Sequence, residues 1–276
     1  MFIIPYMNKK LNIHSSLKLW DEKSISLSKE YPLKTLSRLP KMEGITKDTA
    51  RFLRIKSLWY LLRYDHKKIF LRFFFKNPIT HLSKLLNSYR KKKSYLREGD
   101  FFYYGLKNSE EFIHEASSDH ALLLVGFSYC HKPFECPSKR FSEHCIHDPE
   151  HPVCAQCFIG KIVNHLPSNR VIPLFIPTIH YIGEKLFESI YANPDKKILF
   201  LITACEMSLE MFGDWGNMVS AKGIGVRLDG RICNTMKAFE LSEHGVKPGL
   251  TVVTEPTQEK ILSIISLLHS RNSTTS

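Results

Sequence analysis

The sequence predicts an α/β fold: a Rossmann-like, mainly parallel sheet with a cysteine-rich insertion, preceded by a basic helical N-terminal region. Five short apolar runs in the second half have the composition of strands buried on both faces. Amphipathic segments with helical spacing separate most of these runs. Strands that alternate with helices are typical of a parallel sheet.

Charge divides the 276-residue chain into two parts. Residues 1–100 carry 23 Lys+Arg and 8 Asp+Glu, whereas residues 101–276 carry 16 and 19. We therefore predict a basic, mainly helical region over residues 1–110, an α/β metal-binding domain over 111–270 and a disordered tail over 271–276.

The basic region shows two helical patterns. Residues 1–50 have no regular pattern, but apolar residues recur at helical spacing from about 49 to 75. Pro78 ends that pattern, and a second basic amphipathic helix is expected over about 79–92.

Four aromatic residues between these helices have two interpretations. We expect Phe70, Phe73, Phe74 and Phe75 to pack against the second half of the chain. The alternative is a helix lying on an anionic membrane surface. Nucleic acid is a less favoured partner, because the aromatic residues are crowded together and do not form a stacking platform.

Apolar runs and helical patterns place the α/β elements in order. The expected strands cover 121–127, 171–177, 197–204, 223–228 and 250–254. The expected helices cover 180–192, a segment that begins at 208–212, then 234–245 and 257–270.

Three of the seven cysteines follow predicted strands. Cys130 lies three residues after the first strand, Cys205 directly follows the third, and Cys233 lies just past the fourth. In an open parallel sheet, ligands bind where the carboxyl ends of the strands converge. A lone cysteine is usually a small buried hydrophobe, but three at one edge favour a shared site.

The other four cysteines lie in the insertion that follows the first strand. Cys136, Cys145, Cys154 and Cys157 are separated by eight, eight and two residues. Four thiolates suit either one [4Fe–4S] cluster or one tetrahedral Zn²⁺. The segment after Cys157 has a helical pattern, and a helix N-terminus would favour the thiolate form.

Three histidines in the insertion offer alternative zinc ligands. His144, His147 and His151 could each replace a thiolate, although four cysteines suffice. Outside the insertion, Glu206 beside Cys205 is either an acid/base group or a glutamate favoured at a helix N-terminus. The sequence holds no phosphate-binding loop, no GxGxxG after the first strand, no HExxH and no GxSxG.

The residues around the cysteines resemble a known family. The matching strings are Cys130-x5-Cys136-Pro137-x2-Arg140-Phe141-x3-Cys145, Cys154-x2-Cys157-x-Ile159-Gly160, ITACEMSLEMF and GVRLDGRICNT. They resemble the archaeal and bacterial family catalogued as domain of unknown function number one hundred and sixteen, over roughly residues 120–245. The resemblance covers all seven cysteines but implies no reaction, because the family has no established activity.

Together these patterns predict a cytoplasmic protein, either free or peripheral on a membrane. The N-terminal residues do not have the pattern of a secretory signal, and clustered cysteines in a reducing compartment favour metal. We expect one or two iron–sulfur clusters, with redox or lyase-type chemistry on an unidentified small molecule or with an electron-transfer partner. The alternative is a zinc-stabilised binding module whose basic region contacts anionic lipid or RNA. The sequence leaves open whether the protein is an enzyme.

Overall fold

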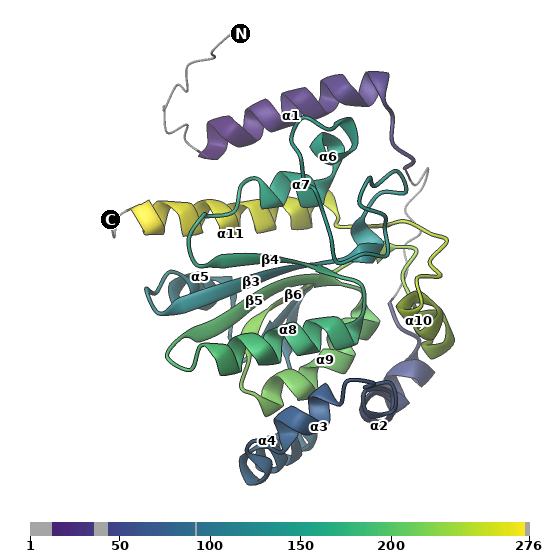
Figure 1. Ribbon diagram of the computed structural model, residues 1–276, viewed down its shortest axis with the longest axis vertical. Coiled ribbons are helices and arrows are strands. Elements are labelled where there is room, and N and C mark those ends of the chain that lie inside the picture. The colour runs from purple at the N-terminus through teal and green to yellow at the C-terminus, as the bar shows by residue number, and fades with distance from the viewer. Residues whose placement is uncertain (1–12, 36–43, 92, 274–276) are drawn as a thin grey trace.

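A six-stranded sheet lies at the centre of the computed structural model, which describes residues 13–35, 44–91 and 93–273 (Figure 1). Its strand order is β1-β2-β6-β5-β3-β4. The strands are β1 Leu96–Glu98, β2 Phe101–Tyr104, β3 Ala121–Ser128, β4 Val171–Ile176, β5 Lys197–Ala204 and β6 Lys222–Arg227. A separate antiparallel pair consists of β7 Asp229–Gly230 and β8 Thr251–Val252.

The predicted α/β class and mostly parallel sheet are confirmed. Strands β4, β3, β5 and β6 are parallel to one another, and β1 and β2 form an antiparallel hairpin beside β6. The predicted fifth parallel strand over 250–254 is wrong. Because β2 occupies the free edge of β6, residues 251 and 252 pair with β7 instead.

Eleven α-helices and one short 3-10 helix, Tyr129–His131, are seen in the described residues. The α-helices are α1 Ile13–Glu30, α2 Lys47–Arg63, α3 Ile69–Phe74, α4 Pro78–Arg90, α5 Ser109–Ala116, α6 Pro152–Gln156, α7 Phe158–Val163, α8 Ile179–Ala192, α9 Glu206–Met218, α10 Met236–Glu243 and α11 Glu255–Ser273. None of these described helices is long and apolar enough to cross a bilayer.

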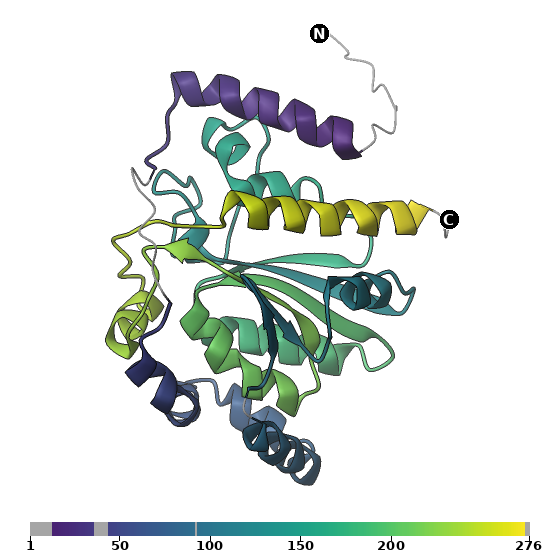
Figure 2. The ribbon, with the colours of Figure 1, turned by 180° about the vertical axis from the view of Figure 1, so that it is seen from behind.

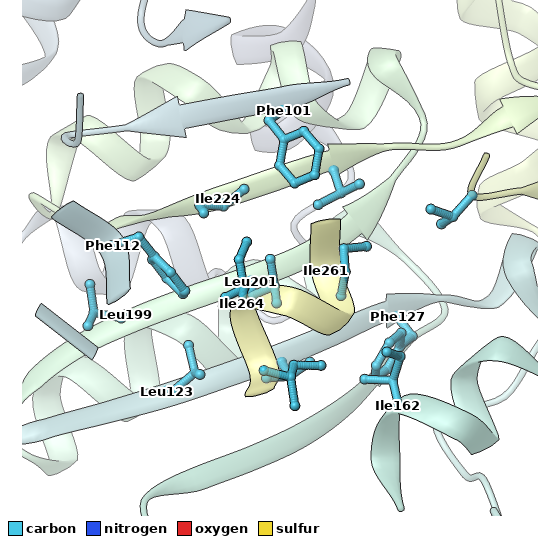
Figure 3. Close-up of a cluster of buried hydrophobic side chains, with 14 of the residues drawn as sticks. Phe101, Phe112, Leu123, Phe127, Ile162, Leu199, Leu201, Ile224, Ile261 and Ile264 are labelled. Carbon is cyan, nitrogen blue, oxygen red and sulfur yellow. The ribbon is translucent and has the colours of Figure 1, made fainter. Parts of the chain in front are cut away.

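Helices cover both faces of the sheet (Figures 1 and 2). On one face, α5, α7 and α11 contribute Phe112, Ile162 and Ile264 to a core that includes Leu123 and Leu201 of the strands (Figure 3). On the other face, α8 and α9 pack over the opposite side of the same strands. Successive side chains of each buried strand point to opposite faces of the sheet, so each strand contributes residues to both cores.

The basic region forms an outer layer of helices. Helices α2, α3 and α4 lie outside α8 and α9, and Figures 1 and 2 show them far from α1. The single helix predicted over 49–75 is divided in two. The carboxylate of Asp65 accepts hydrogen bonds from the backbone N–H groups of Ile69 and Phe70, both at 2.7 Å, and so starts α3.

Other predictions are confirmed or need correction. The helix predicted over about 79–92 is confirmed as α4, with Pro78 in its first turn, a position that suits proline. The stretch 1–50, expected to be irregular, contains α1. Strands β1 and β2 belong to the central sheet, although they precede the predicted domain boundary at 110. The predicted disordered tail is helical to Ser273, and residues 274–276 lie outside the described residues.

The four phenylalanines of the basic region fall in different environments. Phe70 and Phe73 are buried against Phe187, as the core interpretation predicted. Phe74 is half-buried, and Phe75 is exposed. The membrane interpretation is therefore wrong for Phe70 and Phe73.

Candidate functional site

The three strand-end cysteines meet at the reversal of strand order in the parallel sheet. From β3 the chain passes to β4 on one side, and from β4 it crosses through α8 to β5 on the other side of β3. This reversal creates a crevice at the carboxyl ends of β3 and β5, where α/β proteins bind ligands. Cys130 follows β3 and Cys205 follows β5, and both line one pocket in this crevice.

Cys233 completes this group from the segment between β7 and α10. Its thiol interacts with that of Cys205, and the pKa of Cys130, which burial raises, is raised further by negative charge on Cys233. All three cysteines are buried, and none of the seven cysteines forms a disulfide. We call Cys130, Cys205 and Cys233 the strand-end group.

Charge distinguishes two members of the strand-end group. The hydrogen bond from Cys205 and the Lys247 ammonium lower the pKa of Cys233, whereas the same hydrogen bond and burial raise the pKa of Cys205. The Nζ atom of Lys247 lies 3.2 Å from Sγ of Cys233. The arrangement therefore favours a thiolate at Cys233 and a thiol at Cys205.

The pocket beside the strand-end group is mainly apolar. Its cavity volume is about 40 Å³, and its apolar wall includes Ile182, Phe200 and Phe212. Glu243 is an acidic residue of this lining, and burial raises its pKa to about 8. Its carboxyl group accepts a hydrogen bond from the N–H of Ile179 at 2.9 Å. A small apolar cavity thus lies directly next to Cys130 and Cys205.

The other four cysteines line a second, smaller cavity. Cys136, Cys145, Cys154 and Cys157 surround a cavity of about 10 Å³, together with His147. Cys154 lies within α6, and Cys157 immediately precedes α7. We call these four cysteines the insertion group.

Burial raises the pKa of three thiols of the insertion group, those of Cys145, Cys154 and Cys157. Burial raises the pKa of Cys154 to about 11 and that of Cys157 to about 12. Backbone N–H groups of Ile159 and Gly160 lower the pKa of Cys157, but desolvation is the larger effect. The start of α7 thus acts on the pKa of Cys157 in the predicted direction, but burial outweighs it.

A buried lysine organises the chain around the insertion group. Nζ of Lys132 donates hydrogen bonds to the carbonyl oxygens of Lys139, Ser142 and His144, at 3.3, 2.8 and 2.7 Å. Lys132 is 1% exposed, and burial lowers its pKa, an effect that the charges of nearby cysteines oppose. Its positive charge would offset negative charge on the thiolates.

Arg140 links the two groups of cysteines. Its guanidinium donates to the carbonyl oxygen of Cys130 at 3.2 Å, and to those of Lys132, Lys247 and Gly249, each at 3.0 Å. One side chain therefore ties the insertion to the end of β3 and to the segment that carries Lys247. The planar guanidinium can satisfy several carbonyls at once, which an ammonium cannot do in the same geometry.

The histidines of the insertion have separate roles. His147 lines the small cavity, and its Nδ1 lies 2.9 Å from the carbonyl oxygen of Cys145. His151 accepts a hydrogen bond from the N–H of Val153 and thereby caps α6. His144 contributes its backbone carbonyl to Lys132. Of the three, His147 is the one that shares the cavity with the thiols.

A fourth histidine was not anticipated. His131 lies between Cys130 and Lys132 in the sequence. Its side chain is buried, and its Nδ1 atom has no hydrogen-bond partner. Burial lowers its pKa to about 4, so the ring is neutral at physiological pH. The ring packs on Phe158, the residue after Cys157. His131 thus offers an unpartnered neutral nitrogen near both groups of cysteines.

Glu206 is part of an ion-pair network. Its Oε1 lies 2.6 Å from Nη1 of Arg97, and its Oε2 lies 3.8 Å from Nη1 of Arg227. Glu206 is also the first residue of α9, where the helix dipole favours a negative charge. These contacts favour a structural role over acid/base chemistry.

The cysteines suit a metal in kind and number, but their present spacing is not that of a metal site. Across residues 13–35, 44–91 and 93–273, no group of three or more His, Cys, Asp or Glu side chains is placed to hold an ion. Four thiols nonetheless face one cavity beside a buried ammonium, and this donor set fits Zn²⁺ or an iron–sulfur cluster. Metal binding therefore requires the thiols to lose their protons and move closer together.

Comparisons with known proteins return no match. No protein-family model, no curated protein and no solved structure matches the chain. The resemblance described above therefore stays a prediction, carried by the cysteines and the residues around them.

Proposed function

We propose that this protein is a metalloprotein with two metal–thiolate centres, most simply iron–sulfur clusters. The observation that carries the proposal is the division of the cysteines into two groups, each with a lysine ammonium beside it. Buried thiolates require such compensating charge. The insertion group would supply four ligands, and the strand-end group would supply three.

The two groups support different roles. Four thiolates complete a closed centre that stabilises the insertion. Three thiolates beside the apolar pocket leave one position for a ligand, and a metal there would supply Lewis-acid or electron-transfer chemistry. The pocket residues would hold and orient the small molecule, and Lys247 would stabilise negative charge at Cys233.

Zinc in the insertion group is the alternative. The protein would then be a binding module in which the strand-end cysteines bind no metal and the basic region contacts anionic lipid or RNA. The buried Lys132 suits this alternative equally well, because a four-thiolate zinc site also carries negative charge.

Metal analysis separates the two alternatives. Protein purified without oxygen is expected to be brown, to contain iron and acid-labile sulfide, and to bleach in air, because thiolate-to-iron charge transfer absorbs visible light. The measurement is an absorption spectrum with iron, sulfide and zinc analysis. A colourless protein with stoichiometric zinc would contradict the iron–sulfur proposal and support the binding module.

Single cysteine substitutions test the division into two groups. Cys157→Ala is expected to destabilise the protein and expose the insertion to proteolysis, because metal binding contributes to the folding of a loop with little core. Cys205→Ala is expected to retain the fold and to lose about half of the iron, since the strands supply their own apolar burial. Limited proteolysis and iron analysis measure both effects.

The pattern across all seven substitutions provides the control. Cys136, Cys145 and Cys154 should behave as Cys157 does, whereas Cys130 and Cys233 should behave as Cys205 does. Equal losses of fold and metal in all seven variants would mean one interdependent site. Unchanged iron in the three strand-end variants would remove the second centre from the proposal.

A further inference from the structure

Large apolar side chains are concentrated on the solvent side of helices α2–α4. Nine of them are exposed there: Phe52, Ile55, Trp59, Leu62, Leu71, Phe75, Ile79, Leu82 and Leu86. We call this set the outer apolar face. Single exposed apolar residues are common on protein surfaces, but such a concentration marks an interaction site.

The spacing along each helix produces a continuous stripe. In α2, Phe52, Ile55, Trp59 and Leu62 recur every three or four residues, whereas the buried residues Leu53 and Tyr60 face the other way. In α4, Ile79, Leu82 and Leu86 repeat the pattern, opposite the buried His81 and Ser88. Both helices are therefore apolar on their outward side, and α2 is apolar on its core side as well.

Positive charge surrounds the outer apolar face. Residues 47–90 contain 11 Lys+Arg and two acidic residues, Asp48 in the first turn of α2 and Asp65. Asp65 is buried and bonded to the start of α3, so it does not reduce the surface charge of this face. The basic side chains that are exposed include Lys56, Arg63, Lys68, Arg72, Lys76 and Arg90.

One contact shows how charge and apolar surface are combined. The guanidinium of Arg63 lies over the ring of Trp59, 4.6 Å from its centroid, and Trp59 is 55% exposed. Tryptophan and arginine both have an apolar body and a polar end, which suits the boundary between lipid and water.

We propose that the outer apolar face lies on the surface of an anionic membrane. The apolar side chains would enter the boundary between headgroups and acyl chains, and the basic residues would meet anionic headgroups. The helices would lie flat on the membrane, in agreement with the finding that no described helix can span it. This surface is separate from both groups of cysteines, and the proposal deepens the contact with anionic lipid that the zinc alternative gives to the basic region.

Two other occupants suit the face less well. Aliphatic side chains such as Ile55, Ile79 and Leu82 cannot stack on bases, so RNA would leave much of the apolar area exposed. A second copy of the chain would bring two strongly basic surfaces together, which is unfavourable. Anionic lipid satisfies both the apolar and the charged residues.

Vesicle binding by the full-length protein tests this proposal. We expect binding to phosphatidylcholine vesicles that contain phosphatidylglycerol, weaker binding to pure phosphatidylcholine, and a loss of affinity as salt rises. The fluorescence of Trp59 should shift to shorter wavelength on binding, since Trp20 and Trp215 are buried, at 9% and 4% exposed. Trp59→Phe should abolish that shift.

A matched pair of double variants tests the residues. Ile79→Ser with Leu82→Ser is expected to weaken vesicle binding about tenfold or more, because two apolar side chains no longer enter the lipid. Leu19→Ser with Ile25→Ser removes side chains of the same two types, 54% and 61% exposed, from the distant helix α1 and should leave binding unchanged. Circular dichroism confirms that both variants are folded.

Four outcomes would overturn the proposal. They are no binding to either vesicle, equal binding to neutral and anionic vesicles, equal effects of the two double variants, and displacement from vesicles by single-stranded RNA with the same dependence on Ile79 and Leu82. The last outcome would assign the face to RNA. None of these results depends on the metal content of the protein, so they leave the proposed metal centres untouched.

Discussion

Replacing Phe70 with alanine is expected to lower the free energy of unfolding by about 3–5 kcal/mol. Phe70 is 2% exposed, and its ring contacts Trp215 at a centroid distance of 4.4 Å and Phe187 at 5.4 Å. A Cβ atom added to Gly183 would lie 2.9 Å from the same ring, so the space around it is filled. The substitution would leave a cavity between α3, α8 and α9 that its neighbours cannot close.

Phe75→Ala is the matched control, five residues along the same segment. Phe75 is 67% exposed, so its loss should change the free energy of unfolding by no more than about 0.5 kcal/mol. Urea unfolding of both variants, followed by circular dichroism, makes the comparison. Similar losses for the two variants, or a small loss for Phe70→Ala, would contradict the packing of α3 against the α/β core.

Arg140→Ala is expected to cost about 3 kcal/mol or more of stability and to lower the metal content of both proposed centres. The guanidinium donates to four backbone carbonyls, and its removal leaves buried acceptors without partners. The same change frees the insertion from residues 247–249, and therefore separates Lys247 from its present position beside Cys233. Thermal unfolding and iron analysis report the two effects.

The neighbouring Lys139 supplies the control. Lys139→Ala removes one positive charge from the same loop, but its side chain is exposed, and so stability and metal content should stay close to their original values. In stability and metal content, Arg140→Lys should resemble the alanine variant more than the original protein. A lysine ammonium cannot reproduce the hydrogen bonds that the planar guanidinium donates. If Arg140→Lys contained as much metal as the original protein, a positive charge at this position would be sufficient for metal binding.

Much of the α/β half was predictable because its strands are buried on both faces. The runs that became β3 and β5 are uninterrupted apolar stretches, and such stretches have few other stable environments. Residues 101–104 are equally buried, yet a strand of four residues is too short to stand out from the sequence pattern. Residues 251 and 252 do not join the main sheet, because the hairpin of β1 and β2 occupies the edge beside β6. The sequence pattern did not reveal this hairpin.

The cysteines were found from the sequence, but the charges that surround them were not. Spacing relative to the strands located Cys130 and Cys205 at one edge, because the direction of parallel strands fixes where their ends lie. Lys132 and Lys247 gave no comparable signal, since a lysine in a loop is ordinarily solvated. Arg140 appeared only as part of the family resemblance, and its four acceptors come from segments far apart in the chain.

Because of the order in which the chain is synthesised, the outer layer of helices is made before the helices against which it packs. Residues 47–90 leave the ribosome before α8 and α9, whose side chains cover their core-facing surface. Translation from residue 90 to the end of α9 at residue 218 takes roughly 6–26 s, at about 5–20 residues per second. During that interval the apolar core-facing side chains of α2 and α3 are uncovered, in addition to the outer apolar face. A nearby lipid surface or a chaperone therefore competes for this segment before the rest of the protein exists.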